Sequence, residues 1–175
     1  VPVAFGPAVE ERLASLARRY PVAVLRDVAS ASEITTPSSQ QAALARLGER
    51  YANGPDGTLF AIAASELLIR AGAYHAASTR LVRGLAFAPN REEIADAMAY
   101  RFLRANARGE ALAMYNLYVS YAPESAAAYA SRCGFYLGIG EVALAWGDCR
   151  QALRLDPGMP EVRRLLAEIE RRLGA

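Results

Sequence analysis

Apolar residues near the C-terminal end of the chain recur with the period of a helix. Between Pro160 and Leu173 they fall on one face of a helical projection, and the charged residues lie elsewhere on it. The apolar face is formed by Val162, Leu165, Leu166, Ile169 and Leu173, and the charged positions are Glu161, Arg163, Arg164, Glu168, Glu170, Arg171 and Arg172. The pattern predicts an amphipathic helix that closes one end of a core.

Small and large apolar residues repeat along the rest of the chain every 34 residues. Small side chains occupy two of the repeated positions, and large apolar ones occupy two others. The small positions are Ala31, Ser65, Ala99, Cys133 and Ala167, and Ala43, Ala77, Ala111 and Ala145; the large ones are Ile34, Leu68, Phe102 and Tyr136, and Leu13, Leu47, Leu81, Tyr115 and Cys149. Because the distance between packed helices follows the size of the side chains where they cross, the small positions predict a recurring helix crossing.

Prolines and turn-forming residues repeat with the same period. The prolines are Pro21, Pro55, Pro89, Pro123 and Pro157, and the turn-forming residues are Ser38, Gly72, Asn106 and Gly140. Proline ends a helix because it lacks an N–H and clashes with the preceding turn. Gly, Asn and Ser tolerate or initiate non-helical backbone. Each unit is therefore predicted to be a helix, a tight turn and a second helix.

A 34-residue helix, turn and helix with small residues at the crossing and proline at the end resembles the tetratricopeptide repeat (TPR) family. The resemblance is best in residues 58–91 and 126–159, where G-A-Y-x-x-A and G-E-V-x-x-A match the family's turn and the start of its second helix. It implies an all-α fold, a right-handed superhelical stack of antiparallel helix hairpins with about ten helices. The array is predicted to be single (1–175), with a lone leading helix (1–23), a degenerate repeat (24–57), three repeats (58–91, 92–125 and 126–159) and a capping helix (160–175).

Some positions depart from the repeated pattern. Pro37 precedes Ser38 in the polar run TTPSSQQ, so the first helix of that unit is expected to be short and its turn irregular. Arg132 occupies a position that is apolar in other units, namely Ala64, Met98 and Leu166. These departures concern local packing and leave the predicted architecture unchanged.

The leading segment from Pro7 to Tyr20 is predicted to be the second helix of a unit whose first helix is missing. Either residues 1–6 cover the face that this leaves open, or the chain was cut from a longer array; we favour the second reading. Self-association through the uncapped leading unit is a further possibility.

Composition excludes several classes of protein. The chain has 53% hydrophobic residues, enough to bury a continuous core. Its net charge of +2 creates no strong field that would attract nucleic acid. Apolar stretches are too short to span a membrane, so we expect no membrane insertion by this segment. Every one of the 20 basic residues is arginine, which in an alanine-rich chain is typical of a GC-rich, bacterial genome. The compartment, cytoplasmic or periplasmic, stays open.

In the family that the chain resembles, the first helix of each unit lines a concave groove where peptides or helices bind. Helical spacing predicts an apolar floor with charged edges there. The predicted groove residues are Leu59, Ile62, Glu66, Ile69, Arg70, Asp96, Tyr100, Leu103, Arg104 and Leu137. Arg70 and Arg104, one repeat apart, are positioned to bind a partner's carboxylate or carbonyl groups. The alternative is that they are solvated or paired with Glu66 and Asp96.

Residues that carry catalytic or metal chemistry are sparse. The single His75 has no second histidine as a metal partner and is expected to be exposed at a turn. Cys133 and Cys149 fall in two core positions of one hairpin, so they are either buried thiols or, in an oxidising compartment, a disulfide. None of the common nucleotide, zinc or serine hydrolase motifs occurs. We expect no enzymatic activity, no metal and no cofactor.

The sequence therefore predicts a non-catalytic scaffold or assembly module that binds a protein or peptide in its groove. The alternative is a non-catalytic or substrate-presenting region of a larger enzyme or of a secretion or envelope assembly. Because one repeat architecture serves unrelated processes, the sequence alone does not identify the partner.

Overall fold

This computed structural model describes residues 22–34, 36–51, 56–86 and 88–174. All of the regular secondary structure in these ranges is helical, which confirms the predicted all-α class. The predicted leading helix, Pro7 to Tyr20, lies outside the described residues.

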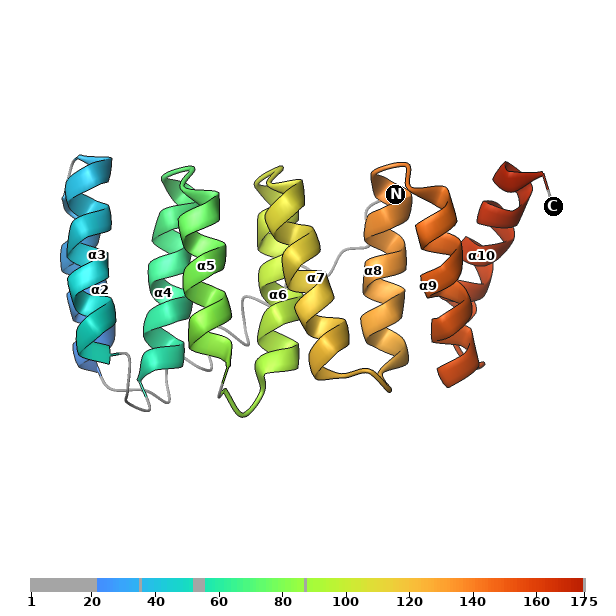
Figure 1. Cartoon of the computed structure of the whole chain (residues 1–175), viewed down its shortest axis with the longest axis horizontal. Helices are drawn as coiled ribbons and strands as arrows, with labels where there is room; N and C mark the ends of the chain where they lie inside the picture. Colours follow the sequence, from blue (N-terminus) through green and yellow to red (C-terminus); the bar gives the residue numbers. More distant parts are fainter. Residues whose placement is uncertain (1–21, 35, 52–55, 87, 175) are drawn as a thin grey trace. The chain divides into compact units, whose positions relative to one another are not determined.

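The chain divides into two compact units, Val1–Pro89 and Asn90–Ala175. The boundary follows Pro89, one of the prolines that repeat every 34 residues. That the two units form a single array remains a prediction. The first unit contains α2 (Val22–Ser32), α3 (Pro37–Tyr51), α4 (Gly57–Arg70) and α5 (Tyr74–Leu85). The second contains α6 (Arg91–Arg104), α7 (Arg108–Tyr121), α8 (Ala126–Gly138), α9 (Val142–Leu155) and α10 (Pro160–Leu173). Helices that follow each other pack as pairs, which are seen side by side in Figure 1 as α4 with α5, α6 with α7 and α8 with α9.

Three of the predicted turn residues adopt left-handed backbone. Gly72, Asn106 and Gly140 have φ angles of 74°, 59° and 85°. In the first of these turns the Ala73 N–H donates to the Leu68 carbonyl at 2.8 Å, and equivalent bonds close the other two turns. A left-handed residue followed by this bond satisfies the last carbonyls of a helix, so the same motif ends α4, α6 and α8.

The prediction that Ser38 is a turn residue was wrong. Ser38 lies in the first turn of α3, which begins at Pro37. Proline is favoured at the first position of a helix because its fixed φ suits the helix and its missing N–H would be unpaired there. The second helix of this pair therefore starts about three residues earlier than the repeat predicts. The expected short first helix is present, because α2 has 11 residues whereas α4 and α6 each have 14.

Small side chains lie buried where the helices of a pair cross. Ser65, Ala99 and Cys133 are completely buried, as are Ala77, Ala111 and Ala145 on the partner helices. The Ser65 hydroxyl donates to the Ala77 carbonyl at 3.0 Å across the crossing of α4 and α5. Another close approach is at Gly84, where an added Cβ would lie 2.2 Å from the Ala61 Cβ. The two backbones could not approach so closely with larger side chains.

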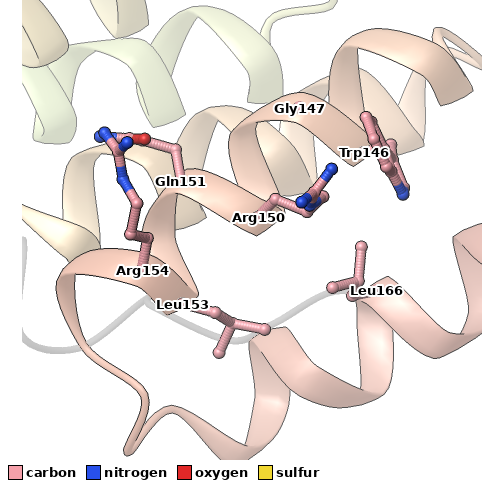
Figure 2. A pocket seen from close by; sticks show the side chains of 7 residues that line it. All are labelled: Trp146, Gly147, Arg150, Gln151, Leu153, Arg154 and Leu166. Atoms are coloured by element: carbon pink, nitrogen blue, oxygen red, sulfur yellow. The ribbon is translucent and has the colours of Figure 1, made fainter.

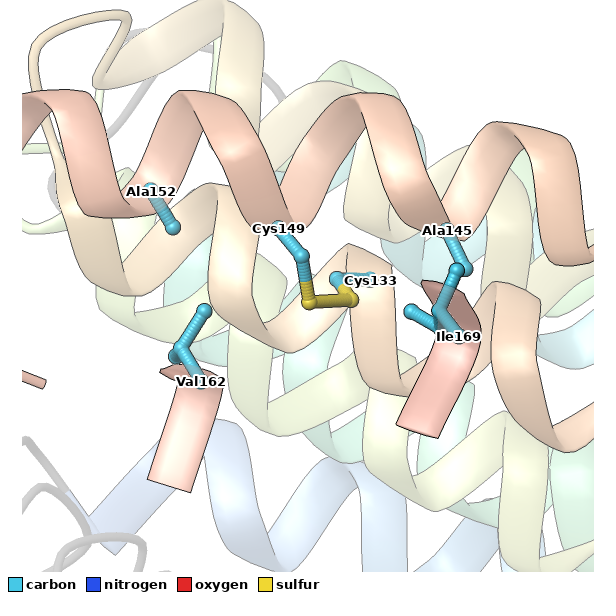
Figure 3. Packing of buried hydrophobic residues seen from close by; sticks show 6 residues of the cluster. All are labelled: Cys133, Ala145, Cys149, Ala152, Val162 and Ile169. Atoms are coloured by element: carbon cyan, nitrogen blue, oxygen red, sulfur yellow. A yellow bond between two sulfur atoms is a disulfide. The ribbon is translucent and has the colours of Figure 1, made fainter. Parts of the chain in front are cut away.

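The pair α8 and α9 has a covalent link at its crossing. Cys133 and Cys149 form a disulfide, with Cα atoms 5.4 Å apart, inside the buried cluster seen in Figure 3. Val162 and Ile169 of α10 pack against the same cluster, which also contains Ala145 and Ala152. The disulfide therefore lies in a core shared by three helices of the second unit.

An ion pair lies next to the disulfide in the sequence. The Arg132 Nε and Nη2 atoms donate to the two carboxylate oxygens of Asp148, at 2.7 and 2.9 Å, and its Nη1 donates to the Asn116 side chain at 2.9 Å. Arg132 and Asp148 are largely buried, with 18% and 11% of their side chains exposed. Hydrogen bonding to Asp148 raises the pKa of Arg132. The arginine that departs from the repeat pattern thus connects α7, α8 and α9. One repeat earlier, the equivalent residues are Met98 and Met114, both completely buried.

We predict opposite effects of alanine at two helical glycines. Gly84→Ala should destabilise the fold by about 1–3 kcal/mol because its Cβ would overlap Ala61. Gly134→Ala should stabilise it by about 0.5–1 kcal/mol, since nothing lies within 4 Å of the added Cβ and alanine favours the helix. Urea unfolding of both variants and the wild type measures the difference. Equal effects of the two substitutions would contradict the close approach.

A second prediction concerns the ion pair. Asp148→Met should cost about 2–4 kcal/mol because it leaves the Arg132 charge unpaired and largely buried. Adding Arg132→Met should recover most of this loss, since the double variant copies Met98 and Met114. Unfolding by urea gives both values. The matched control is Arg172→Met with Glu168→Met. These residues form an ion pair on the surface of α10, with 52% and 34% of their side chains exposed, so little change in stability is expected. A double variant as unstable as Asp148→Met would show that the Met pair does not fit this site.

Candidate functional site

The predicted groove residues fall in both compact units. Leu59, Ile62, Glu66, Ile69 and Arg70 lie on α4 of the first unit. In the second unit, Asp96, Tyr100, Leu103 and Arg104 lie on α6, and Leu137 lies on α8.

The apolar residues of the α4 set are not accessible to a partner. Leu59, Ile62 and Ile69 expose only 5%, 6% and 8% of their surface, because α4 packs against α2, α3 and α5. These three residues therefore offer little surface to a partner, and their place in a binding groove stays a prediction. Glu66 is half-buried, and Arg70 is exposed at the last residue of the helix.

The α6 set forms an accessible stripe along one side of its helix. Asp96, Tyr100 and Leu103 are half-buried, and Arg104 is exposed at the last residue of α6. Arg104 lies eight positions after Asp96, so the stripe is about 12 Å long at 1.5 Å per helical residue. Leu137 on α8 is also half-buried. A negative group, an apolar stretch and a positive group follow each other along this surface.

Asp96 lies in an environment that disfavours its charge. Burial raises the pKa of its carboxyl group, although the Ser131 hydroxyl of α8 donates a hydrogen bond that opposes the shift. The pKa of Tyr115 on α7 is raised by its burial and by the negative charges of Asp96 and Tyr100. Burial and the same Asp96 charge also raise the pKa of Tyr118. The carboxylate therefore lies near uncharged side chains of α7 and α8, and the effect of its burial outweighs the hydrogen bond from Ser131.

Charges along α6 follow the direction of the helix. Glu92 and Glu93 lie in its first turn, and Arg101 and Arg104 lie in its last. This arrangement complements the helix dipole, which is positive at the first turn and negative at the last. Within the described residues, no hydrogen bond or ion pair engages Arg70 or Arg104, so the guanidinium groups of both remain available.

Sequence reasoning missed Ser131 and Tyr118 as neighbours of Asp96. The repeat carries a signal for Ser131, because the equivalent residues Ala63 and Ala97 are apolar. Asp96 itself stands where other units place Ile62 and Ala130. Asp96 on α6 and Ser131 on α8 are thus polar residues at repeat positions that are apolar in other units. This shared departure is the signal in the sequence that could have suggested their contact.

Other candidate chemistry is limited. His75 is exposed at the second residue of α5, as predicted. Among the described residues, no group of histidine, cysteine, aspartate or glutamate side chains is arranged to hold a metal ion. No helix in the same part of the chain is both long and apolar enough to cross a membrane.

Comparison with known proteins identifies the fold. No family model and no curated protein sequence matches the chain. The first TPR domain of Spaghetti (RPAP3), bound to the HSP90 peptide SRMEEVD, has a similar structure with a TM-score of 0.51 and 20% identity, covering 70% of this chain and 97% of that chain. MamA from Desulfovibrio magneticus RS-1 has a TM-score of 0.50 and 21% identity over 98% of this chain and 88% of that chain. At these identities the likeness shows the fold alone: the chain has the TPR fold, which confirms the predicted resemblance.

We predict that Asp96→Asn stabilises the protein at neutral pH. The pKa of Asp96 in the folded protein is raised above its ordinary value of 3.8. Stability is therefore lost as the pH rises from 3.8 through the pKa of the folded state, because the carboxyl group then ionises in a buried place. The asparagine variant avoids this cost and can still accept the Ser131 hydrogen bond. Its melting temperature should therefore exceed that of the wild type at pH 7, and the difference should vanish at acid pH.

The matched control is Glu124→Gln, which neutralises an exposed carboxylate in the same unit. It should change the melting temperature little at either pH. If Asp96→Asn were less stable than the wild type at pH 7, this would contradict the raised pKa of Asp96.

Proposed function

We propose that the chain is a non-catalytic protein-interaction module and that the stripe on α6, together with Leu137 of α8, binds a segment of a partner protein. The observation that carries the proposal is the half-buried Asp96 carboxylate, whose charge is disfavoured by burial. Such a group costs stability, and a positive group of a partner would offset the cost. The similar structure of RPAP3, which holds a peptide, supports a partner of this class.

The bound segment would carry groups that match the stripe. Tyr100, Leu103 and Leu137 provide half-buried apolar surface, which favours apolar side chains of the partner. A basic group would bind Asp96, and an acidic group would bind Arg104. Because the stripe is about 12 Å long, an extended segment of about four residues spans it at 3.3 Å per residue. The opposite charges at its ends would fix the direction of binding.

Arg70 is a candidate contact of its own in the first unit. It ends α4 as Arg104 ends α6, and both side chains are exposed. Guanidinium groups bind carboxylates and backbone carbonyls through several N–H donors in one plane. We therefore propose that Arg70 binds an acidic group independently of the stripe on α6.

Binding of a purified partner tests the proposal. After capture with the wild-type chain and purification, the partner is titrated against Arg104→Glu, and separately against Asp96→Asn. Each should weaken binding by about tenfold or more, because it removes a charge-assisted contact. Arg108→Glu is the control, since it makes the same charge change as Arg104→Glu at an exposed residue of α7. If neither variant differed from this control, the partner would bind elsewhere and the proposed site would be rejected.

A further inference from the structure

The last helix, α10, has an uncovered side where the preceding repeat is covered. The small residue at the helix crossing is Ala31 in α2, Ser65 in α4, Ala99 in α6 and Cys133 in α8, and each of these is buried. The equivalent residue of α10, Ala167, is exposed. In α8 this position faces α9, to which Cys133 is bonded. Within the described residues, no helix covers α10 in the same way.

An open groove of about 480 Å³ lies beside this uncovered side, between α9 and α10. Figure 2 shows Trp146 and Arg150 along α9, with Leu166 of α10 opposite them. Leu153 and Arg154 continue the α9 side of the groove toward the end of that helix. Trp146, Leu153 and Leu166 are half-buried, so the groove combines apolar surface with exposed arginines.

The preceding repeat shows what occupies the equivalent place. Subtracting one repeat of 34 residues turns Leu166 into Arg132 and Arg150 into Asn116. Arg132 bonds to Asn116 and, on the other side, to Asp148 of α9. In the preceding repeat, α9 packs beside α8 and so places a carboxylate, Asp148, at the position equivalent to this groove.

Charge in the groove favours an acidic occupant. The Arg150 guanidinium lies over the Trp146 ring, 4.5 Å from its centroid, which holds it in place without using its N–H donors. Arg154 lies one helical turn further along, and none of the residues that line the groove is acidic. Among the described residues neither arginine forms an ion pair, so both can bind carboxylates of an incoming helix.

We propose that this groove is a docking site for an acidic amphipathic helix of a partner protein. The helix packs its apolar face on Trp146, Leu153 and Leu166, beside α10 as α9 packs beside α8. Its carboxylates bind Arg150 and Arg154. The site is separate from the α6 stripe, and it does not depend on the function proposed for that stripe.

The single tryptophan of the chain, Trp146, lies in the groove and gives a local readout. The probe is a synthetic peptide of about four helical turns, with leucines at helical spacing and glutamate as its only charged residue. A second peptide carries lysine at each glutamate position. The glutamate peptide should change the Trp146 emission saturably, and the lysine peptide should bind at least about tenfold more weakly.

Charge reversal at the groove completes the experiment. Arg150→Glu with Arg154→Glu should weaken binding of the glutamate peptide by at least about tenfold, because both carboxylate contacts become repulsive. Arg164→Glu is the control, since Arg164 is exposed on α10 and does not line the groove. Circular dichroism verifies that each variant keeps its helices.

Three results would overturn the proposal. The first is equal binding of the two peptides, or no saturable change with either. The second is unchanged binding of the glutamate peptide by the double variant. The third is a concentration-dependent dimer of the wild type, seen by analytical ultracentrifugation and lost in the double variant, which would assign the groove to a second copy of the chain.

Discussion

The close crossing of two helices is the constraint on which the rest of each hairpin depends. Where Cys133 and Ala145 stand, only small side chains or a disulfide fit between the backbones of α8 and α9. The turn at Gly140 must then reverse the chain within a few residues, which requires a left-handed φ. With the crossing and the turn in place, the positions of larger side chains follow, and so does the face that remains for other molecules.

This constraint explains how much of the fold could be predicted from sequence. Small residues at a fixed period, with Gly72, Asn106 and Gly140 between them, identify the hairpins and their turns because steric limits act on each residue individually. The turn before α3 escaped prediction because Pro37 favours helix initiation locally, and this preference overrides the repeat. Boundaries are thus predictable where one steric rule acts and less so where two compete.

The candidate site could be predicted only in part. Helical spacing places Asp96 and Arg104 on one side of α6, and the structure keeps them accessible. It could not reveal that Leu59 and Ile62 are buried, because burial depends on how neighbouring helices pack and not on the spacing within one helix. The pairing of Asp96 with Ser131 likewise depends on the distance between α6 and α8. Contacts between helices require the structure, whereas faces of single helices do not.

The ion pair of Arg132 and Asp148 disfavours incorrect pairing between helices of neighbouring hairpins during folding. The pairs α6 with α7 and α8 with α9 are built from helices of 13 or 14 residues and share small crossing residues and a turn motif, so their apolar pattern would also allow α6 to pair with α9. Such an exchange would place Met98 opposite Asp148 and leave a carboxylate buried without its guanidinium partner. The charges therefore distinguish helices that their apolar pattern makes nearly equivalent, and they act against incorrect pairing between neighbouring repeats.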